Sequence, residues 1–298
     1  MSNTADPAFR EVKERPGPRV PTSDLLRLDG RTIVVTGAAG FLGLEVAGAI
    51  LEVGGDVISM DIVSSPPAEP WKQLQETAKK HGRKIQYFRV DVTDPDSISD
   101  TFSTLGAELA HPIRGLVAAA GVSENGPAHE FSVERFRRLI DINVVGTFSV
   151  AKAVALEMKK ADVGGSMVLV ASMSGTVANK GVDTAAYNTS KSGVLQLGRS
   201  LAAEWGSRKG MPLIRVNTLS PGYIRTAATA EALKMPGMET QWTGDNMLYR
   251  LSTVDEFRGP VLFLLSEASS FITGADLRVD GGHCACADEQ LLLLLLHS

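Results

Sequence analysis

Two residues able to exchange a proton, Tyr187 and Lys191, lie four positions apart in the segment AAYNTSKSG (185–193). Residues at this spacing are neighbours on one face of a helix. A free phenol has a pKa of about 10, too high for efficient acid–base chemistry at neutral pH, and a nearby ammonium lowers that pKa by favouring the phenolate. The pair therefore indicates a proton-transfer site. The alternative is a tyrosine that only adjoins a solvated lysine.

A glycine-rich turn occupies VVTGAAGFLG (34–43), between a predicted strand and a predicted helix. Its glycines, Gly37, Gly40 and Gly43, allow a dinucleotide pyrophosphate to approach the backbone, and the helix N-terminus supplies free N–H groups. The position at the start of a strand–helix–strand unit is the context that such a site requires. The alternative is a tight turn that only lets helix and strand pack closely.

Acidic residues end the next two predicted strands. Asp61 lies 18 residues after Gly43, where a carboxylate can accept hydrogen bonds from the adenosine ribose and would repel a 2′-phosphate. This favours NAD(H) over NADP(H) without excluding the latter, and the alternative is a helix cap or a solvated loop acid. Asp91 and Val92, at the end of the third strand, are expected beside the adenine.

Strand and helix patterns alternate along the body of the chain. The predicted strands are 32–37, 56–61, 85–92, 113–121, 165–172, 214–222 and 275–282, and the predicted helices are 41–54, 68–81, 95–109, 131–160, 184–206 and 254–266. Such alternation predicts an α/β fold, a Rossmann-like, doubly wound parallel sheet of about seven strands with helices on both faces. We expect a flexible extension at 1–26, one domain at 27–283 and a tail at 284–298. The irregular segment 226–250 has the character of a lid.

Composition limits the classes of partner. Lys and Arg number 30 against 34 acidic residues, a net charge of −4 without a basic cluster, so nucleic acid is not expected. The two cysteines, Cys284 and Cys286, suit a reducing compartment and form too small a set for a metal site. We find no secretory signal and no run of 18–20 apolar residues, and the six leucines 291–296 are too short to cross a membrane. A cytoplasmic protein without membrane contact is expected.

A series of motifs occurs in a fixed order along the chain: TGAAGFLG (36–43), VAAAGV (117–122), DINVVGTF (141–148), VLVASMSG (168–175), YNTSK (187–191), NTLSPGYIRT (217–226) and VDGG (279–282). Over about 27–283 this resembles the short-chain dehydrogenase/reductase family in its single-domain form. The resemblance implies transfer of a hydride between a nicotinamide cofactor, NAD(H) or NADP(H), and a secondary alcohol or ketone. It also implies a homodimer or homotetramer formed through 131–160 and 184–206.

The resemblance assigns roles to four residues. Tyr187 would be the catalytic acid/base, Lys191 its partner, Asn143 the residue that positions a water for proton relay, and Ser172 the hydrogen-bond partner of the substrate oxygen. Ser174 is the rival to Ser172. The cofactor-binding set would be Gly37, Gly40, Phe41, Leu42, Gly43, Asp61, Asp91, Val92, Ala119, Gly121, Asn143, Tyr187, Lys191, Pro221, Gly222, Ile224 and Thr226. Phe41 departs from the family, which usually has glycine there.

The substrate is less constrained than the chemistry. A looser likeness to fungal polyol dehydrogenases and ketose reductases favours a small polyol or ketose. Reductases of polyketides or other cyclic ketones in fungal secondary metabolism are an alternative, and a non-catalytic dinucleotide sensor or scaffold is a third. Possible hydroxyl partners are Ser172, Ser174, Glu124, Asn179, Gln241 and Asn246, and possible apolar lining residues are Met235, Met238, Trp242 and Met247.

Overall fold

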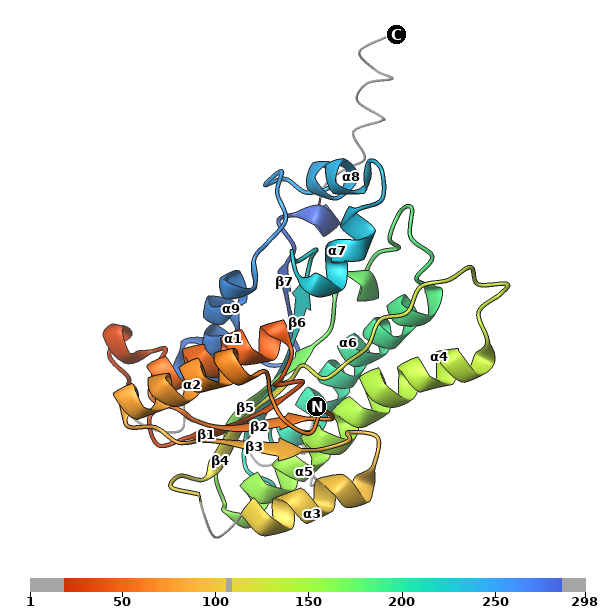
Figure 1. The fold of residues 1–298 in the computed structure, drawn as a ribbon. Coiled ribbons are helices and arrows are strands. Elements are labelled where there is room, and N and C mark those ends of the chain that lie inside the picture. Colours follow the sequence, from red (N-terminus) through yellow and green to blue (C-terminus); the bar gives the residue numbers. More distant parts are fainter. Residues whose placement is uncertain (1–18, 106–108, 286–298) are drawn as a thin grey trace, which may run out of the picture.

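Seven parallel strands form one sheet in the computed structural model, which describes residues 19–105 and 109–285, except the side chains of 227, 228 and 231 (Figure 1). The strands are β1 (Thr32–Thr36), β2 (Asp56–Asp61), β3 (Ile85–Arg89), β4 (Ile113–Ala118), β5 (Gly165–Val170), β6 (Ile214–Pro221) and β7 (Asp276–Val279). Their order across the sheet is β3-β2-β1-β4-β5-β6-β7. The central strands are buried on both faces, which explains their near-continuous apolar sequence.

Helices cover both faces of this sheet. They are α1 (Phe41–Glu52), α2 (Ala68–His81), α3 (Pro95–Leu105), α4 (Val133–Ile140), α5 (Thr147–Lys160), α6 (Ala185–Trp205), α7 (Ala227–Leu233), α8 (Met238–Gly244) and α9 (Arg258–Leu265). One apolar core lies between the sheet and α1, α2 and α9, and a second lies between the sheet and α3, α5 and α6 (Figure 1). The predicted fold class is thereby confirmed.

The expected domain boundaries at residues 26 and 283 stay predictions. Residues 1–18 and 286–298, which include the six leucines and Cys286, lie outside the described residues. Within 19–26, Thr22–Asp24 forms a short 3-10 helix. The ordered core begins immediately afterwards, because Leu28 is fully buried beneath α1.

The predicted continuous helix at 131–160 contains a π-helical segment, Asp141–Gly146, between α4 and α5. The Thr147 hydroxyl donates a hydrogen bond of 2.7 Å to the Asn143 carbonyl, so a side chain contributes to the hydrogen bonds of the π-helical turn. Apolar periodicity does not reveal such an insertion. π-helical turns are often found at functional sites, and this one contains Asn143.

The combined helix Val133–Lys160 is the one helix among the described residues with the length and composition of a membrane span. Its most apolar window has a mean hydropathy of 1.6 and is 44% buried. The expectation of no unbroken run of 18–20 apolar residues holds for this helix, because Asp141, Asn143 and Lys152 interrupt it. Val150, Val154 and Met158 are completely buried against the sheet, and core helices are apolar for that reason.

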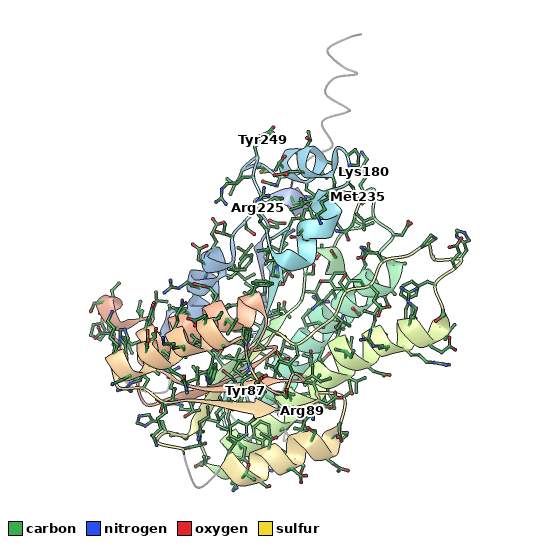
Figure 2. The ribbon with its side chains drawn as sticks, in the orientation of Figure 1. Tyr87, Arg89, Lys180, Arg225, Met235 and Tyr249 are labelled. Atoms are coloured by element: carbon green, nitrogen blue, oxygen red, sulfur yellow. The ribbon has the colours of Figure 1, made fainter. Side chains whose placement is uncertain are left out.

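The irregular segment 226–250 contains two short helices, α7 and α8, beyond the carboxyl edge of the sheet. Figure 2 shows Lys180, Arg225, Met235 and Tyr249 around this region, far from Tyr87 and Arg89 on β3. Met238, Trp242 and Leu251 are buried there in a small apolar cluster of their own. We call the segment 176–184 together with α7 and α8 the roof.

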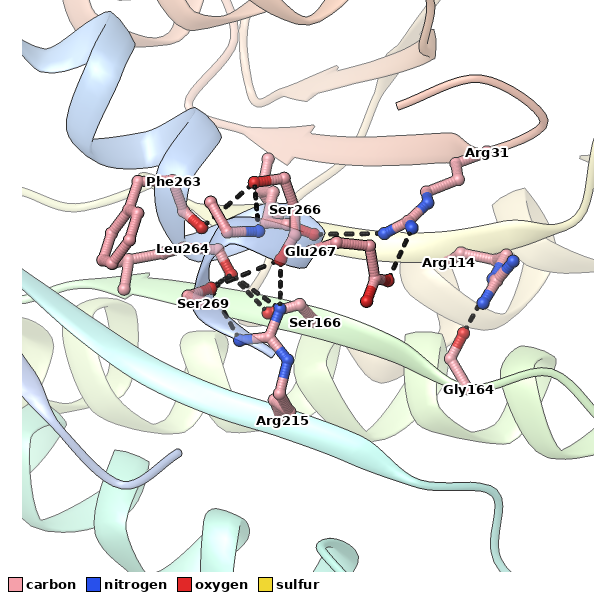
Figure 3. Close-up of polar contacts among 12 residues, drawn as sticks. Arg31, Arg114, Gly164, Ser166, Arg215, Phe263, Leu264, Ser266, Glu267 and Ser269 are labelled. Carbon is pink, nitrogen blue, oxygen red and sulfur yellow. Dashed lines mark hydrogen bonds and ion pairs between the residues drawn. The ribbon is translucent and has the colours of Figure 1, made fainter. Parts of the chain in front are cut away.

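A buried arginine, Arg215, forms hydrogen bonds at the amino-terminal edge of the sheet, away from the carboxyl edge (Figure 3). Arg215, near the start of β6, donates hydrogen bonds to the Ser269 hydroxyl (2.9 Å) and to the carbonyls of Leu264 (3.1 Å), Ser266 (2.9 Å) and Ile272 (3.1 Å). Burial lowers its pKa to about 10, so it stays charged at neutral pH. The guanidinium thus ties β6 to the C-terminal end of α9.

Candidate active site

A cavity of about 880 Å³ opens at the carboxyl ends of β1 to β4. In the strand order β1 adjoins both β2 and β4, which is the crevice where doubly wound sheets bind nucleotides. Gly37, at a φ of +66°, lines it, and a Cβ on this residue would lie 2.7 Å from the Ala119 carbonyl oxygen. Only glycine fits there, which leaves the backbone open to a ligand, as a dinucleotide pyrophosphate requires.

The predicted acidic residues lie on the wall of this cavity, which we call the dinucleotide cavity. Asp61 accepts hydrogen bonds from the backbone N–H of Ala39 (3.0 Å) and of Val63 (3.3 Å), so its carboxylate is fixed beside the glycine turn. Asp91 accepts from the backbone N–H (2.9 Å) and the hydroxyl (2.7 Å) of Thr93. Val92 lines the same cavity.

A second cavity, of about 450 Å³, adjoins the first and shares Ala119, Gly121 and Val122 with it. We call it the substrate cavity. The predicted residues that line it are Leu42, Ala119, Gly121, Ser172, Ser174, Asn179, Tyr187, Lys191, Pro221, Gly222, Ile224, Thr226 and Trp242. Segments that are far apart in the sequence therefore meet at this cavity. They are the carboxyl ends of β4, β5 and β6 and the first turns of α6.

Lys191 is 6% exposed, and its ammonium donates a hydrogen bond of 2.8 Å to the carbonyl of Val170, the last residue of β5. The ammonium lies 5.8 Å from the centroid of the Tyr187 ring, within the range of a cation–π contact. Burial lowers the pKa of Lys191 to about 8. Most of the lysine is still charged at neutral pH, so a cation stands beside the phenol.

The pKa of Tyr187 does not move as the sequence suggested. Burial raises it, and a hydrogen bond with Ser172 opposes that shift. The net lowering of the pKa expected from Lys191 does not occur in this structure, because removal of the phenol from water has the largest effect. A raised pKa keeps the proton on the phenol at neutral pH, which suits a proton donor.

The two rival serines lie close together. Ser172 and Ser174 are both buried and both line the substrate cavity. The Ser172 hydroxyl accepts a hydrogen bond of 3.1 Å from the Ser174 backbone N–H and begins the 3-10 helix Met173–Gly175. The contact with Tyr187 belongs to Ser172.

Asn143, Phe41 and Gly43 do not line either cavity. The Asn143 amide bonds both backbone groups of Val122, at 2.9 Å each, and donates to the Ser190 hydroxyl at 2.9 Å, so it lies one layer behind the wall. Phe41 is 53% exposed at the first position of α1. Gly43 packs against the carbonyl of Gly37.

Several predicted substrate contacts fall elsewhere. Glu124 forms ion pairs with Arg135 and Arg138, and Asn246 bonds the carbonyls of Trp242 and Arg250. Met235 and Met247 are exposed, Gln241 bonds Lys180, and neither Gln241 nor Met238 lines the substrate cavity. Tyr223, which lines the substrate cavity together with Trp242, was not among the predicted site residues. Its place directly after Pro221-Gly222, at a strand end, was an available signal.

Comparisons with known proteins identify the family of this chain. Residues 37–283 match the family model described as enoyl-(acyl carrier protein) reductase. A short-chain dehydrogenase/reductase of Aspergillus versicolor, notP′, is 62% identical over 95% of this chain and 97% of its own length. This chain belongs to the short-chain dehydrogenase/reductase family. The resemblance drawn from the motifs is thus confirmed.

Other family members extend the comparison. A D-arabinitol 2-dehydrogenase (ribulose-forming) of Candida albicans is 35% identical over 86% of this chain and 94% of its own. The crystal structure of an NADPH-dependent 3-quinuclidinone reductase of Rhodotorula rubra superposes with a TM-score of 0.82, at 29% identity, over 93% of this chain and all of that one. Some relatives are named NADH-dependent and others NADP-dependent.

Membership of the short-chain dehydrogenase/reductase family defines the class of reaction. The chain is an oxidoreductase that acts on CH–OH and C=O groups of small molecules with a nicotinamide cofactor. The expected enzyme class is confirmed, and the alternative of a non-catalytic sensor is not supported.

Proposed function

We propose that this protein interconverts a ketone and a secondary alcohol with Tyr187 as the group that gives and takes the proton. The observation that carries the proposal is the meeting of Tyr187, Ser172 and Lys191 in one cavity that adjoins the dinucleotide cavity. When bound, the nicotinamide supplies a hydride to the carbonyl carbon. The glycine turn, Asp61 and Asp91 would hold the dinucleotide, and their positions suit that role.

The chain's own residues supply the other half of the reaction. In reduction, the substrate carbonyl oxygen lies against the hydroxyls of Tyr187 and Ser172, and the phenol proton passes to that oxygen as the carbonyl bond is lost. The Lys191 ammonium then stabilises the phenolate, which regains a proton from solvent. Asn143, which bonds Val122 and Ser190, fixes the wall behind these groups and would position a water for that return.

We propose NAD(H) as the preferred cofactor because of Asp61. Asp61 is the last residue of β2, the strand that follows the glycine turn. Its carboxylate lines the dinucleotide cavity and accepts hydrogen bonds from the backbone N–H groups of Ala39 and Val63. A negative charge there repels a 2′-phosphate and can accept hydrogen bonds from ribose hydroxyls.

An Asp61→Asn variant tests both the proposed ketone reduction and the proposed preference for NADH over NADPH. Asparagine keeps an acceptor oxygen for the Ala39 N–H but loses the charge, so we expect the ratio of kcat/KM for NADH to that for NADPH to fall at least about tenfold. The measurement is nicotinamide absorbance at 340 nm with a ketone in excess. Asp100→Asn, on the exposed face of α3, is the control. An unchanged ratio would remove Asp61 from cofactor selection.

Two substrate classes have support. The D-arabinitol 2-dehydrogenase relative favours a polyol or ketose, and the 3-quinuclidinone reductase favours a cyclic ketone. We also propose a homodimer or homotetramer, because Phe148 and Leu156 are exposed apolar residues on the helix 131–160.

A further inference from the structure

Two aromatic rings form one wall of the substrate cavity. Tyr223, two residues after the end of β6, and Trp242, on α8, both line it. Their ring centroids are 3.9 Å apart with 5° between the ring planes. Trp242 is 4% exposed and belongs to the apolar cluster of the roof with Met238 and Leu251. The two stacked rings therefore give this wall of the substrate cavity an aromatic, largely apolar character.

The wall is held in place by hydrogen bonds across the roof. The Asn179 amide donates to the Tyr223 hydroxyl at 3.0 Å, and the Thr184 hydroxyl donates to the Asn179 carbonyl oxygen at 3.2 Å. The Gln241 amide donates to the Lys180 carbonyl at 2.8 Å and so joins α8 to the segment 176–184. A wall fixed in advance binds a ligand of matching shape without a further ordering penalty.

Three polar side chains near the wall, those of Asn179, Thr184 and Thr229, are already paired within the protein, and Ser123 and Asn125 line the cavity at its exposed side. Asn179 and Thr184 bond as described, and the Thr229 hydroxyl donates to the Ile224 carbonyl at 2.7 Å. An open-chain polyol carries a hydroxyl on almost every carbon. Each hydroxyl that enters this cavity without a partner loses its hydrogen bonds to water and gains none in return.

The indole N–H of Trp242 adds a further observation. It is buried, and among the described residues no acceptor lies within hydrogen-bond distance. A buried donor without an acceptor is unfavourable, so a ligand acceptor that reaches this N–H in the plane of the indole ring would gain a hydrogen bond.

We propose that the substrate is a flat ring ketone with few hydroxyl groups, and that Trp242, stacked on Tyr223, determines this specificity. The inference rests on the proposed ketone–alcohol function and names its substrate class. The ring packs against the Tyr223–Trp242 wall, which leaves its carbonyl free to reach Tyr187 and Ser172 on the same cavity. Open-chain polyols and ketoses fit less well because the wall gives their hydroxyls no partners.

The test uses 1-tetralone, a fused-ring ketone, and D-ribulose, an open-chain ketose, as probes with NADH and with NADPH. We expect kcat/KM for 1-tetralone to exceed that for D-ribulose at least tenfold in the wild type. Trp242→Ala should raise KM for 1-tetralone about tenfold, with a much smaller change in kcat and in KM for D-ribulose. Trp242→Phe keeps an aromatic face and should retain most of the preference.

Met238→Ala is the matched control, because Met238 is buried in the same roof cluster but does not line the cavity. It should lower the melting temperature without changing the preference between the two probes. A wild type that prefers D-ribulose would overturn the proposal. An equal rise of KM for both probes in Trp242→Ala would do the same, since that is the signature of a general loss of structure.

A failure of the proposed ketone–alcohol function would give a different result from a failure of the proposed substrate class. If the wild type turned over neither probe, calorimetric binding of each to the NADH-loaded protein would still decide the substrate class. Tighter binding of 1-tetralone, lost in Trp242→Ala, supports the aromatic wall. Tighter binding of D-ribulose contradicts it.

Discussion

Replacing Tyr187 by phenylalanine will lower kcat for ketone reduction by about 10²- to 10⁴-fold, the range that a positioned proton donor contributes. The variant removes one hydroxyl and keeps the ring, so the packing of the first turns of α6 and the contact with Lys191 remain. Cofactor affinity, measured by NADH fluorescence titration, should change little. Steady-state absorbance assays at neutral pH, where the raised pKa keeps the native phenol protonated, give the rate.

Tyr249→Phe is the control for this variant. Tyr249 is 63% exposed and lies on the outer surface of the roof (Figure 2), so loss of its hydroxyl should leave kcat unchanged. A Tyr187→Phe protein that is folded, binds NADH and keeps wild-type turnover would exclude Tyr187 as the proton donor.

Gly43→Ala will weaken cofactor binding by about 10- to 100-fold, the equivalent of a moderate overpacking penalty. A Cβ at this position would lie 2.3 Å from the Gly37 carbonyl oxygen and 2.7 Å from the Ala38 Cα, both backbone atoms that cannot move aside freely. The first turn of α1 must then separate from the glycine turn, which displaces the N–H groups expected to hold the pyrophosphate. Titration of NADH fluorescence measures the effect.

Gly48→Ala provides a control on the same helix. Its Cβ would lie 3.4 Å from the end of the Leu74 side chain, an ordinary contact. Alanine also favours the helix more than glycine does, so this variant should be at least as stable as the wild type and bind NADH normally. Equal affinities for Gly43→Ala and Gly48→Ala would show that the close packing of the turn is irrelevant to the cofactor.

The sheet could be predicted from sequence because most strands are short runs rich in apolar and β-branched residues that alternate with helical patterns. The order of the motifs then placed Tyr187, Lys191 and the glycine turn at the same edge, since parallel strands bring their carboxyl ends together. The π-helical segment at Asp141–Gly146 was missed because its Ile142, Val144 and Val145 continue the apolar character of the helix on either side.

The substrate cavity was harder to predict because its walls depend on tertiary contacts. Tyr223 and Trp242 are 19 residues apart and meet only through the packing of α8 on the end of β6. Glu124 looked available for substrate hydroxyls, but its partners Arg135 and Arg138 come from α4. The pKa of Tyr187 also depends on burial, which the spacing from Lys191 does not reveal.

The most direct measurement is transfer of deuterium from NADH labelled at both C4 positions to 1-tetralone, followed by mass spectrometry of the alcohol. We predict that the wild type yields alcohol with one deuterium on the carbon that bears the hydroxyl, and that Tyr187→Phe yields almost none in the same time. Unlabelled alcohol, or equal amounts of labelled alcohol from both proteins, would contradict a cofactor hydride paired with a proton from Tyr187.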